Sequence, residues 1–264
     1  MSRTPDTDIL PHADYRSSHL AEGEAYHAKF EQQIYRALMW EIERETLTQL
    51  LAERTDRATC GLLDFACGTG RVLAALEPQV AKATGVDISA SMLSVAARIA
   101  PGAEIVCADI TRDPVLDLRQ FDVITAFRFF PNAEPALREE AMAKLAGLLA
   151  PGGWLIINNH RRRGSLKHRV RLLRSAIGLA KGKDMHTMSD DEVAALAARH
   201  GLRVHGTRTA GILPVLKERR PFLPRVLLAP LERWASGLRA LEHLGSHRIY
   251  VLAAPAAGEG TRSA

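Results

Sequence analysis

Residues 61–73 have the sequence GLLDFACGTGRVL, and this stretch decides the fold. An apolar pair leads to an acid, Asp64, and then to two glycines, Gly68 and Gly70. A short apolar run that ends in glycine-rich sequence is typical of a buried strand passing into a helix. Glycine permits a tight turn close to a ligand, and the following helix offers free N–H groups and a positive dipole end. The stretch therefore predicts a site for a polar, partly anionic ligand at the carboxyl end of a parallel strand.

Two cofactor classes use a loop of this kind. The dinucleotide fingerprint requires a small third residue where this chain has Leu73, which weakens an NAD interpretation. The sequence DFACGTG at residues 64–70 instead resembles the first motif of class I S-adenosylmethionine-dependent methyltransferases. It departs from that motif at Ala66, which stands at the family's first glycine, and alanine is small enough to make the difference minor. The cofactor implied is S-adenosyl-L-methionine.

The resemblance implies an α/β fold with a doubly wound, seven-stranded, mainly parallel sheet whose last strand is antiparallel. A helical pattern at residues 22–52 adds one or two N-terminal helices, and two helical insertions follow the fifth and sixth strands. We expect a single methyltransferase domain at residues 21–254. A flexible arm at 1–20 would precede it, and a disordered tail at 255–264 would follow it.

A second acid ends the next expected strand, at residues 82–87. Asp87 follows Gly70 at close to the spacing at which an acid reaches the two ribose hydroxyls of a nucleoside. One carboxylate can accept from both hydroxyls. Asp87 could instead cap the helix at 90–99, but Ser89 suits that position equally well. We therefore favour the ribose role.

Two later strands complete the predicted site. The third is expected to end at Ala108-Asp109-Ile110. The resemblance places Asp109 near the adenine amino group; the alternative is a turn residue before Thr111. The fourth is expected at residues 121–130. By resemblance, the cofactor-binding residues are Asp64, Ala66, Cys67, Gly68, Gly70, Asp87, Ile88, Met92, Asp109, Ile110 and Ala126.

The substrate site is expected at the end of the fourth strand. Arg128, Phe129 and Asn132 are candidates for its mouth, although core packing explains Phe129 equally well. In the N-terminal helices, Tyr26 or Tyr35 could touch the ligand, and packing against the sheet is the favoured alternative.

Composition and cysteine usage narrow the class of protein. The chain has 264 residues, 47% hydrophobic and 25% charged, which is enough for one sizeable globular domain. Three cysteines without C-x-x-C spacing argue against disulfides or zinc, and with no signal peptide or membrane span they favour a cytoplasmic protein. Asn158 and Asn159 stand where metal-dependent catechol-type enzymes keep carboxylates, so we predict no metal.

The net charge of +5 is concentrated in the insertion at residues 160–187. Residues 160–183 carry nine Lys or Arg and no acid, with apolar residues that allow an amphipathic helix. A solvated charged face is the ordinary explanation. However, nine bases without an acid repel one another, which favours an anion-binding role. A second insertion, at 211–245, has an apolar stripe including Trp234. It could pack on the chain's own sheet, which is the default, or cap the substrate pocket, meet a second subunit or touch a membrane surface.

The implied reaction is in-line displacement at the sulfonium methyl. Because sulfur already activates this methyl, the enzyme mainly positions the nucleophile and removes its proton where needed. His160, after the fifth strand, is the first candidate for a base, and Arg128 is the second catalytic candidate. A structural or phosphate-contacting role explains His160 equally well, because Arg161 and two more arginines follow it.

The acceptor is predicted to be a small molecule. Enzymes that methylate exocyclic base nitrogens carry an Asn/Asp/Ser-Pro-Pro-aromatic motif where residues 129–132 read FFPN, which argues against DNA. The basic insertion, including Arg161, suggests an acidic or phosphate-bearing acceptor, possibly lipid-linked, with peripheral membrane contact. Two alternatives remain: an RNA methyltransferase that uses residues 161–183 for backbone contacts, and a non-catalytic S-adenosylmethionine-binding protein. The oligomeric state is not predicted.

Overall fold

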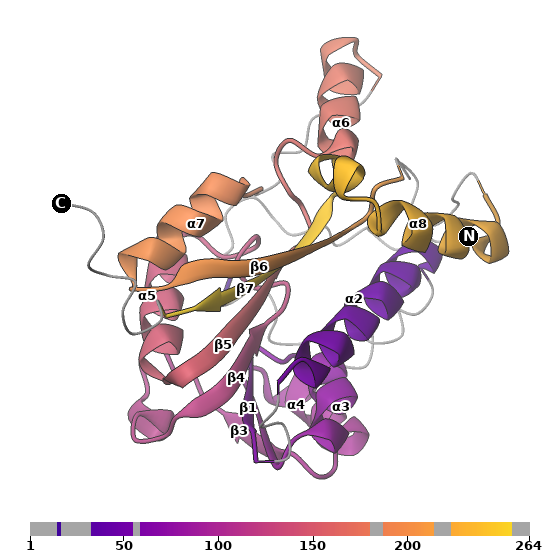
Figure 1. Ribbon diagram of the computed structural model, residues 1–264. Coiled ribbons are helices and arrows are strands. Elements are labelled where there is room, and N and C mark those ends of the chain that lie inside the picture. The colour runs from indigo at the N-terminus through magenta and orange to yellow at the C-terminus, as the bar shows by residue number, and fades with distance from the viewer. Residues whose placement is uncertain (1–14, 17–32, 55–58, 180–186, 214–222, 255–264) are drawn as a thin grey trace, which may run out of the picture.

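A computed structural model describes residues 15–16, 33–54, 59–179, 187–213 and 223–254 (Figure 1). The predicted terminal arm and tail therefore lie almost wholly outside the described residues, as do Tyr26 and the rest of the segment before Gln33.

Seven strands form one sheet in the order β3-β2-β1-β4-β5-β7-β6 (Figure 1). Neighbours from β3 to β5 pair in parallel, and β7 is antiparallel to both β5 and β6. This confirms the predicted seven-stranded, mainly parallel sheet with an antiparallel last strand. The strands are β1 (Gly61–Phe65), β2 (Lys82–Asp87), β3 (Glu104–Cys107), β4 (Phe121–Ala126), β5 (Leu149–Asn159), β6 (Arg203–Ala210) and β7 (His247–Ala253).

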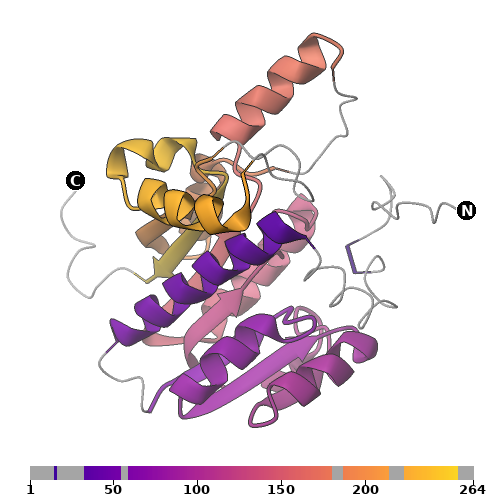
Figure 2. The same ribbon diagram turned by 90° about the vertical axis from the view of Figure 1, so that its right-hand side faces the viewer.

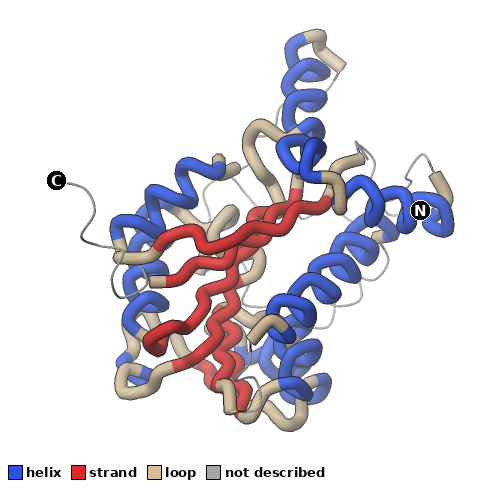
Figure 3. The backbone as a smooth tube through the Cα atoms, in the orientation of Figure 1, coloured by secondary structure: helices blue, strands red, loops and turns tan. Residues whose placement is uncertain are grey.

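Helices cover both faces of the sheet (Figure 3). Successive strand residues point to opposite faces, so Leu62 packs in one core layer and Leu63 in the other. The burial of each such leucine stabilises the fold by about 1.5–3 kcal/mol. One layer holds α2 (Ile34–Ala52) and α3 (Arg71–Leu76), beside which α4 (Ala90–Ile99) packs; the other holds α5 (Pro135–Gly147) and α7 (Asp190–Arg199).

Helix α2 forms because apolar residues recur at helical spacing. Its buried face includes Tyr35, Leu38, Met39 and Ile42, and it packs on α3, β6 and the insertion helix α8. Ile34, the first residue of the helix, is more than a third exposed. The helix brings one acid, Glu43, into this buried face.

Two strand ends differ from the prediction. Strand β4 ends at Ala126 rather than at residue 130, and β3 ends at Cys107 rather than at Ile110. The cause in β4 is a turn: Arg128 has a φ of +62°, which breaks the extended backbone. The N–H groups of Asn132 and Ala133 then bond to the carbonyl of Phe129. The residues expected to end the strand therefore form a loop.

The basic insertion contains a helix, α6 (Leu166–Ala176), that projects from the body of the molecule in two perpendicular views (Figures 1 and 2). This agrees with the expected amphipathic helix. None of its residues is buried, and Leu172 and Leu173 are each more than half exposed.

The second insertion contains α8 (Arg225–Ser236) and a short 3-10 helix, η3 (Arg239–Leu244). Helix α8 packs on α2 and β6 through residues such as Leu228 and Ala235, which agrees with the default expectation. Trp234 does not join this packing and is 63% exposed. Within the described ranges, no helix combines the length and the apolar character that a membrane span requires.

Candidate cofactor and substrate site

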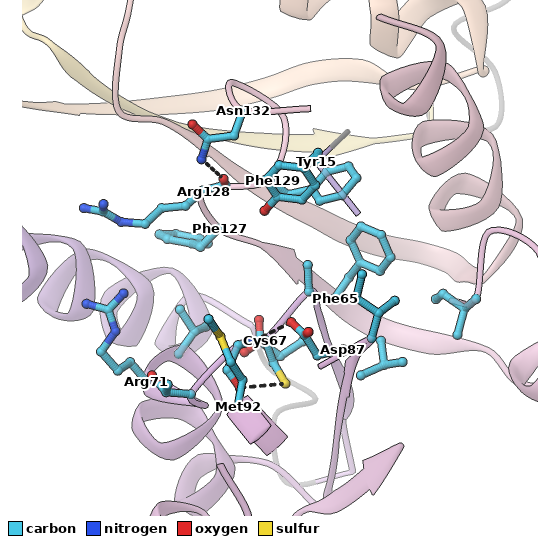
Figure 4. Close-up of a pocket in the computed structure, with 18 of the residues that line it drawn as sticks. Tyr15, Phe65, Cys67, Arg71, Asp87, Met92, Phe127, Arg128, Phe129 and Asn132 are labelled. Atoms are coloured by element: carbon cyan, nitrogen blue, oxygen red, sulfur yellow. Dashed lines mark hydrogen bonds between the residues drawn. The ribbon is translucent and has the colours of Figure 1, made fainter. Parts of the chain in front are cut away.

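A first cavity opens at the carboxyl ends of β1, β2 and β4, where the strand order reverses between β1 and β4. Ligands bind at such a reversal in open α/β sheets because loops from neighbouring strands diverge there. The cavity encloses about 1130 Å³, counted out to its open mouth. Figure 4 shows polar and aromatic side chains facing this space from both sides.

The glycine-rich loop turns in a left-handed backbone conformation at three positions. Ala66, Gly68 and Gly70 have φ values of +53°, +56° and +78°. A Cβ on Gly70 would lie 2.8 Å from the Cβ of Ala96, so only glycine lets α3 begin against α4. Ala66 adopts its φ with a side chain present, a conformation that costs about 1–2 kcal/mol for most residues.

The carboxylate of Asp87 is fixed from two sides. One oxygen accepts the backbone N–H of Gly68 at 2.8 Å, and the other accepts that of Ser89 at 2.9 Å. Ser89 also caps α4, because its hydroxyl accepts the N–H of Met92 at 3.4 Å. Asp87 also lines the first cavity, where hydroxyl groups of a ligand can donate to its carboxylate.

Asp64 lies at the base of the first cavity and is buried. Its Oδ1 accepts the hydroxyl of Thr125, the register partner of Asp64 on β4, at 2.7 Å. Its Oδ2 has no hydrogen-bond partner among the described residues. Burial raises the pKa of Asp64 to about 7, and the nearby charge of Asp87 adds to the effect. The site thus holds a buried oxygen that could accept from a donor or face a cation.

Asp109 also lines the first cavity, in a dense network. It accepts from the backbone and hydroxyl of Thr111, at 3.2 and 2.6 Å, and from the guanidinium of Arg16 at 2.8 Å. The turn role and the cavity-lining position are therefore both present in the structure. Burial would raise the pKa of Asp109, but the hydrogen bond from the Thr111 hydroxyl and then the charge of Arg16 hold it below its usual range.

Several residues of the first cavity were not predicted. Tyr15 lies edge-on to Phe129, with ring centroids 5.3 Å apart, and its backbone N–H bonds to Glu134 (Figure 4). Trp40 and Glu43 come from α2. Nothing in the sequence near Tyr15 indicates this position, because an isolated segment of the arm reaches the site only in the folded chain. An acid within the apolar face of α2 was a usable signal for Glu43.

Arg71, the first residue of α3, is a second omission. Its guanidinium lies 5.5 Å from the ring centroid of Trp40, a cation–π distance. Glu43 is buried on the same side of the cavity, and burial raises its pKa, while Arg128, Asn158 and Arg71 oppose the rise. The first cavity therefore carries acidic and basic groups together at the end formed by α2 and α3.

A second cavity adjoins the first and shares Arg128 with it. It lies between the start of α2, the end of β5 and the start of α6, and encloses about 870 Å³ counted out to its mouth. His160 and Arg161 line the second cavity and do not line the first. Burial, then the charge of Arg128, lowers the pKa of His160 well below its ordinary value.

The predicted residues divide between these places. All the predicted cofactor residues line the first cavity except Gly70, which shapes the loop, and Ala126, which is buried in β4. Phe129 lines the first cavity, and its ring centroid lies 4.8 Å from that of Phe65. Its position therefore fits both the mouth of the site and packing in the core. Asn132 lines the first cavity and accepts from Arg161 at 3.2 Å. Tyr35 lines the second cavity rather than the first.

In its fold, this chain resembles the class I S-adenosylmethionine-dependent methyltransferases. Residues 62–153 match the sequence model of a family described as a methyltransferase domain. The chain is 34% identical over 161 residues to a dTDP-4-amino-2,3,4,6-tetradeoxy-D-glucose N,N-dimethyltransferase of Saccharopolyspora spinosa. That match spans 60% of this chain and only 60% of the relative.

Solved structures share the fold at low sequence identity. Magnesium protoporphyrin IX methyltransferase from Synechocystis PCC 6803, solved with bound SAH, has a TM-score of 0.60 at 14% identity, covering 84% of this chain and 86% of that one. The [4+2]-cyclase SpnF has a TM-score of 0.50 at 18% identity, covering 80% of each chain. These likenesses concern the fold alone, and the second shows that the fold also serves a protein named for a different reaction.

The residues present fit the cofactor of this class. S-adenosylmethionine carries ribose hydroxyls that donate, a zwitterionic amino-acid end and a cationic sulfur. Asp87 offers acceptors at the end of β2, the buried Oδ2 of Asp64 can face positive charge, and Glu43 and Arg71 offer opposite charges. Within the described part of the chain, no three His, Cys, Asp or Glu side chains group as metal ligands would.

Proposed function

We propose that the protein transfers the methyl group of S-adenosylmethionine to a small-molecule acceptor that carries an anionic group. One observation carries the proposal: Arg128 lines both cavities, so the cofactor cavity adjoins a strongly basic one. A ligand that reaches from one to the other would present a nucleophile to the methyl group and an anion to the arginines. The name of the Saccharopolyspora spinosa relative supports this, because a dTDP-linked amino sugar contains both an amine and a diphosphate.

The polarity of the first cavity supports one orientation of the cofactor. The ribose would bond to Asp87, and the adenine would lie toward Asp109 and Ile110. The amino-acid end would then lie toward α2 and α3, where Glu43 can accept from its ammonium group and Arg71 can bind its carboxylate. The sulfonium methyl would point to the mouth at Arg128.

The chain's contribution to the reaction is mainly positional. The cofactor supplies an activated methyl group; a lone pair of the acceptor forms the new bond to carbon as the carbon–sulfur bond breaks, and S-adenosylhomocysteine leaves. Phe129 and Tyr15 exclude water from one side of the cavity, while Arg128 holds the acceptor near the methyl group. Because binding already holds the reacting atoms in line, the chemical step does not have to pay the entropy loss of a bimolecular encounter.

The proposed mechanism assigns no proton transfer to His160. Its lowered pKa makes the imidazole a weak base at neutral pH, and its ring lines the second cavity. An amine acceptor that enters in its neutral form needs no base for the displacement itself, because its surplus proton can leave to solvent after the transfer.

A transfer assay with methyl-labelled S-adenosylmethionine tests the proposed function. The acceptors are amines with and without a phosphate or diphosphate group, of otherwise equal structure. We expect labelled product only from the phosphorylated member of a pair. Labelling of the uncharged member alone would contradict the anionic acceptor, and transfer to tRNA alone would favour the RNA alternative. Binding of the cofactor without transfer to any acceptor would favour the non-catalytic alternative.

The exposed leucines of α6 support a lipid-linked acceptor held at an anionic bilayer. Helix α6 presents Leu172 and Leu173 beside basic residues such as Arg169 and Arg174, all exposed. A basic amphipathic helix of this kind binds the boundary between lipid headgroups and acyl chains. The membrane would then be the surface from which the acceptor is drawn.

A further inference from the structure

We propose that the second cavity is a diphosphate-binding subsite, in which the acceptor's phosphoryl groups are held while its nucleophile reaches into the first cavity. The inference rests on the proposed function, because it assigns a place to the anionic part of that acceptor. It makes the cavity, rather than the exposed basic face of α6, the source of acceptor specificity.

The charge of the lining points to an anion. Six cationic side chains line the second cavity, and no Asp or Glu does so among the residues described: Arg36, Arg128, Arg161, Arg162, Lys167 and Arg171. The guanidinium of Arg162 forms an ion pair with Asp190, with 2.8 Å between Nη2 and Oδ2, and Asp190 does not line the cavity. Like charges gathered around one space repel one another, and a bound anion relieves that repulsion. A diphosphate, with several negative charges, matches this excess better than a single carboxylate does.

The cavity is built by parts of the chain that are distant in sequence. Arg36 comes from α2, Arg128 from the loop after β4, Arg161 from the end of β5, and Lys167 and Arg171 from α6. This convergence distinguishes the second cavity from the exposed side of α6, where neighbouring charges lie on one helix. Arginine suits phosphate because its planar group can form two parallel hydrogen bonds.

His160 supplies a second, independent sign of a ligand. It lines the cavity, and its Nδ1 is buried without a hydrogen-bond partner among the described residues. The ring of His247 lies beside it, with the two ring centroids 6.4 Å apart. Buried polar atoms are almost always hydrogen-bonded, so an unpaired one in a cavity calls for a partner that the chain does not provide. A phosphate oxygen, or a hydroxyl bonded to the phosphate, is such a partner.

Calorimetric titration of the full chain with inorganic pyrophosphate tests the inference, with inorganic phosphate as the weaker probe. Arg36→Gln and Lys167→Gln should each weaken pyrophosphate binding by about tenfold, the effect of losing one charge-assisted bond. Arg169→Gln is the matched control, because Arg169 is on α6, as Lys167 is, but is exposed and does not line the cavity. It should leave the affinity nearly unchanged. Equal weakening by all three variants would overturn the proposal in favour of diffuse attraction by the basic segment.

A second measurement separates this inference from the proposed function. Each variant is also titrated with S-adenosylmethionine, whose proposed cavity none of the substituted residues lines. We expect unchanged cofactor affinity in all three. Cofactor binding without any pyrophosphate binding to the wild-type protein would overturn the subsite alone. Pyrophosphate binding without cofactor binding would overturn the proposed function.

The imidazole of His160 provides a local readout. Pyrophosphate should shift the ring resonance of His160 in an NMR titration, and the absence of that resonance in His160→Gln distinguishes it from His168 and His247, which also line the cavity. Binding that leaves this resonance unmoved would place the anion elsewhere and overturn the assignment. Thermal melting of His160→Gln, compared with wild type, shows whether the variant is folded before the comparison is made.

Discussion

The Oδ1 of Asn158 accepts the backbone N–H of Arg128 at 2.6 Å, and this bond joins the end of β5 to the loop where the two cavities meet. The Nδ2 of the same side chain donates to Glu43 on α2 at 2.9 Å. One buried amide thus holds the left-handed turn at Arg128 and anchors a buried acid.

Replacing this amide should therefore destabilise the protein and distort the site. Asn158→Ala leaves a backbone donor and a buried carboxylate without their partner, each costing about 1–3 kcal/mol. We expect a loss of at least about 2 kcal/mol in the free energy of unfolding, measured with urea. Asn132→Ala, which removes a more exposed amide beside the same turn, is the control and should lose less. Equal effects would show that the buried position of Asn158 has no special role.

Asp64 should make stability depend on pH. Its pKa is about 7 in the folded protein and 3.8 when unperturbed, so between those values the folded chain keeps a proton that the unfolded chain releases. The stabilisation from this group is complete below pH 4 and is lost as pH rises through about 7, by up to about 1.4 kcal/mol per pH unit. Asp64→Asn should remove that slope.

Urea unfolding of wild type and Asp64→Asn at several values between pH 4 and pH 8 measures the difference directly. Other groups titrate equally in both proteins, so the difference between their free energies of unfolding at each pH reports Asp64 alone. We expect the free energy of unfolding of Asp64→Asn to increase relative to that of the wild type as pH rises. Parallel curves across this range would mean that Asp64 ionises normally in the folded protein.

Adjacent arginines of the basic segment should behave differently. Arg162 is buried, forms a two-pronged pair with Asp190 and donates to the carbonyl of His243. Arg163 meets Glu192 at 3.1 Å and is half exposed. We expect Arg162→Gln to lose about 3 kcal/mol of stability, and Arg163→Gln to lose less than about 1 kcal/mol. Similar melting temperatures for the two variants would contradict this distinction.

The proposed bilayer contact of α6 can be tested by sedimentation with lipid vesicles. The protein should co-sediment with vesicles that contain phosphatidylglycerol and remain soluble with phosphatidylcholine alone, because both charge and apolar insertion are needed. Leu172→Asp and Leu173→Asp should abolish sedimentation. Val226→Asp, at an exposed apolar position on α8, is the control. Sedimentation that is unaffected by the α6 variants would assign the contact to another surface.

The sequence predicted the fold because the periodic elements and the loop at residues 64–70 act locally. Gly68 was found from the glycine-rich motif and Asp87 from its spacing, and the parallel pairing of β1 and β2 brings the two residues within hydrogen-bonding distance. The length of β4 was not predictable in this way. Residues 121–130 are mostly apolar, and the turn at Arg128 depends on Asn158, thirty residues away in the chain.

The site residues that escaped prediction depend on tertiary contacts. Tyr15 and Arg16 reach the first cavity through partners far along the chain, such as Glu134 and Asp109. His160 follows the end of β5 and lines the second cavity rather than the first. Its position in the sequence does not distinguish the two cavities, because the packing of distant segments decides which cavity it faces.

Titration of the purified protein with S-adenosylmethionine, by calorimetry, tests the central claim most directly. We expect micromolar binding, no binding of NADH, and about a 100-fold weaker affinity in Asp87→Ala, which loses the acceptor of two ribose hydroxyls. Folding of the variant is checked by circular dichroism. Absence of S-adenosylmethionine binding to the folded wild-type protein, or equal binding by Asp87→Ala, would contradict the account.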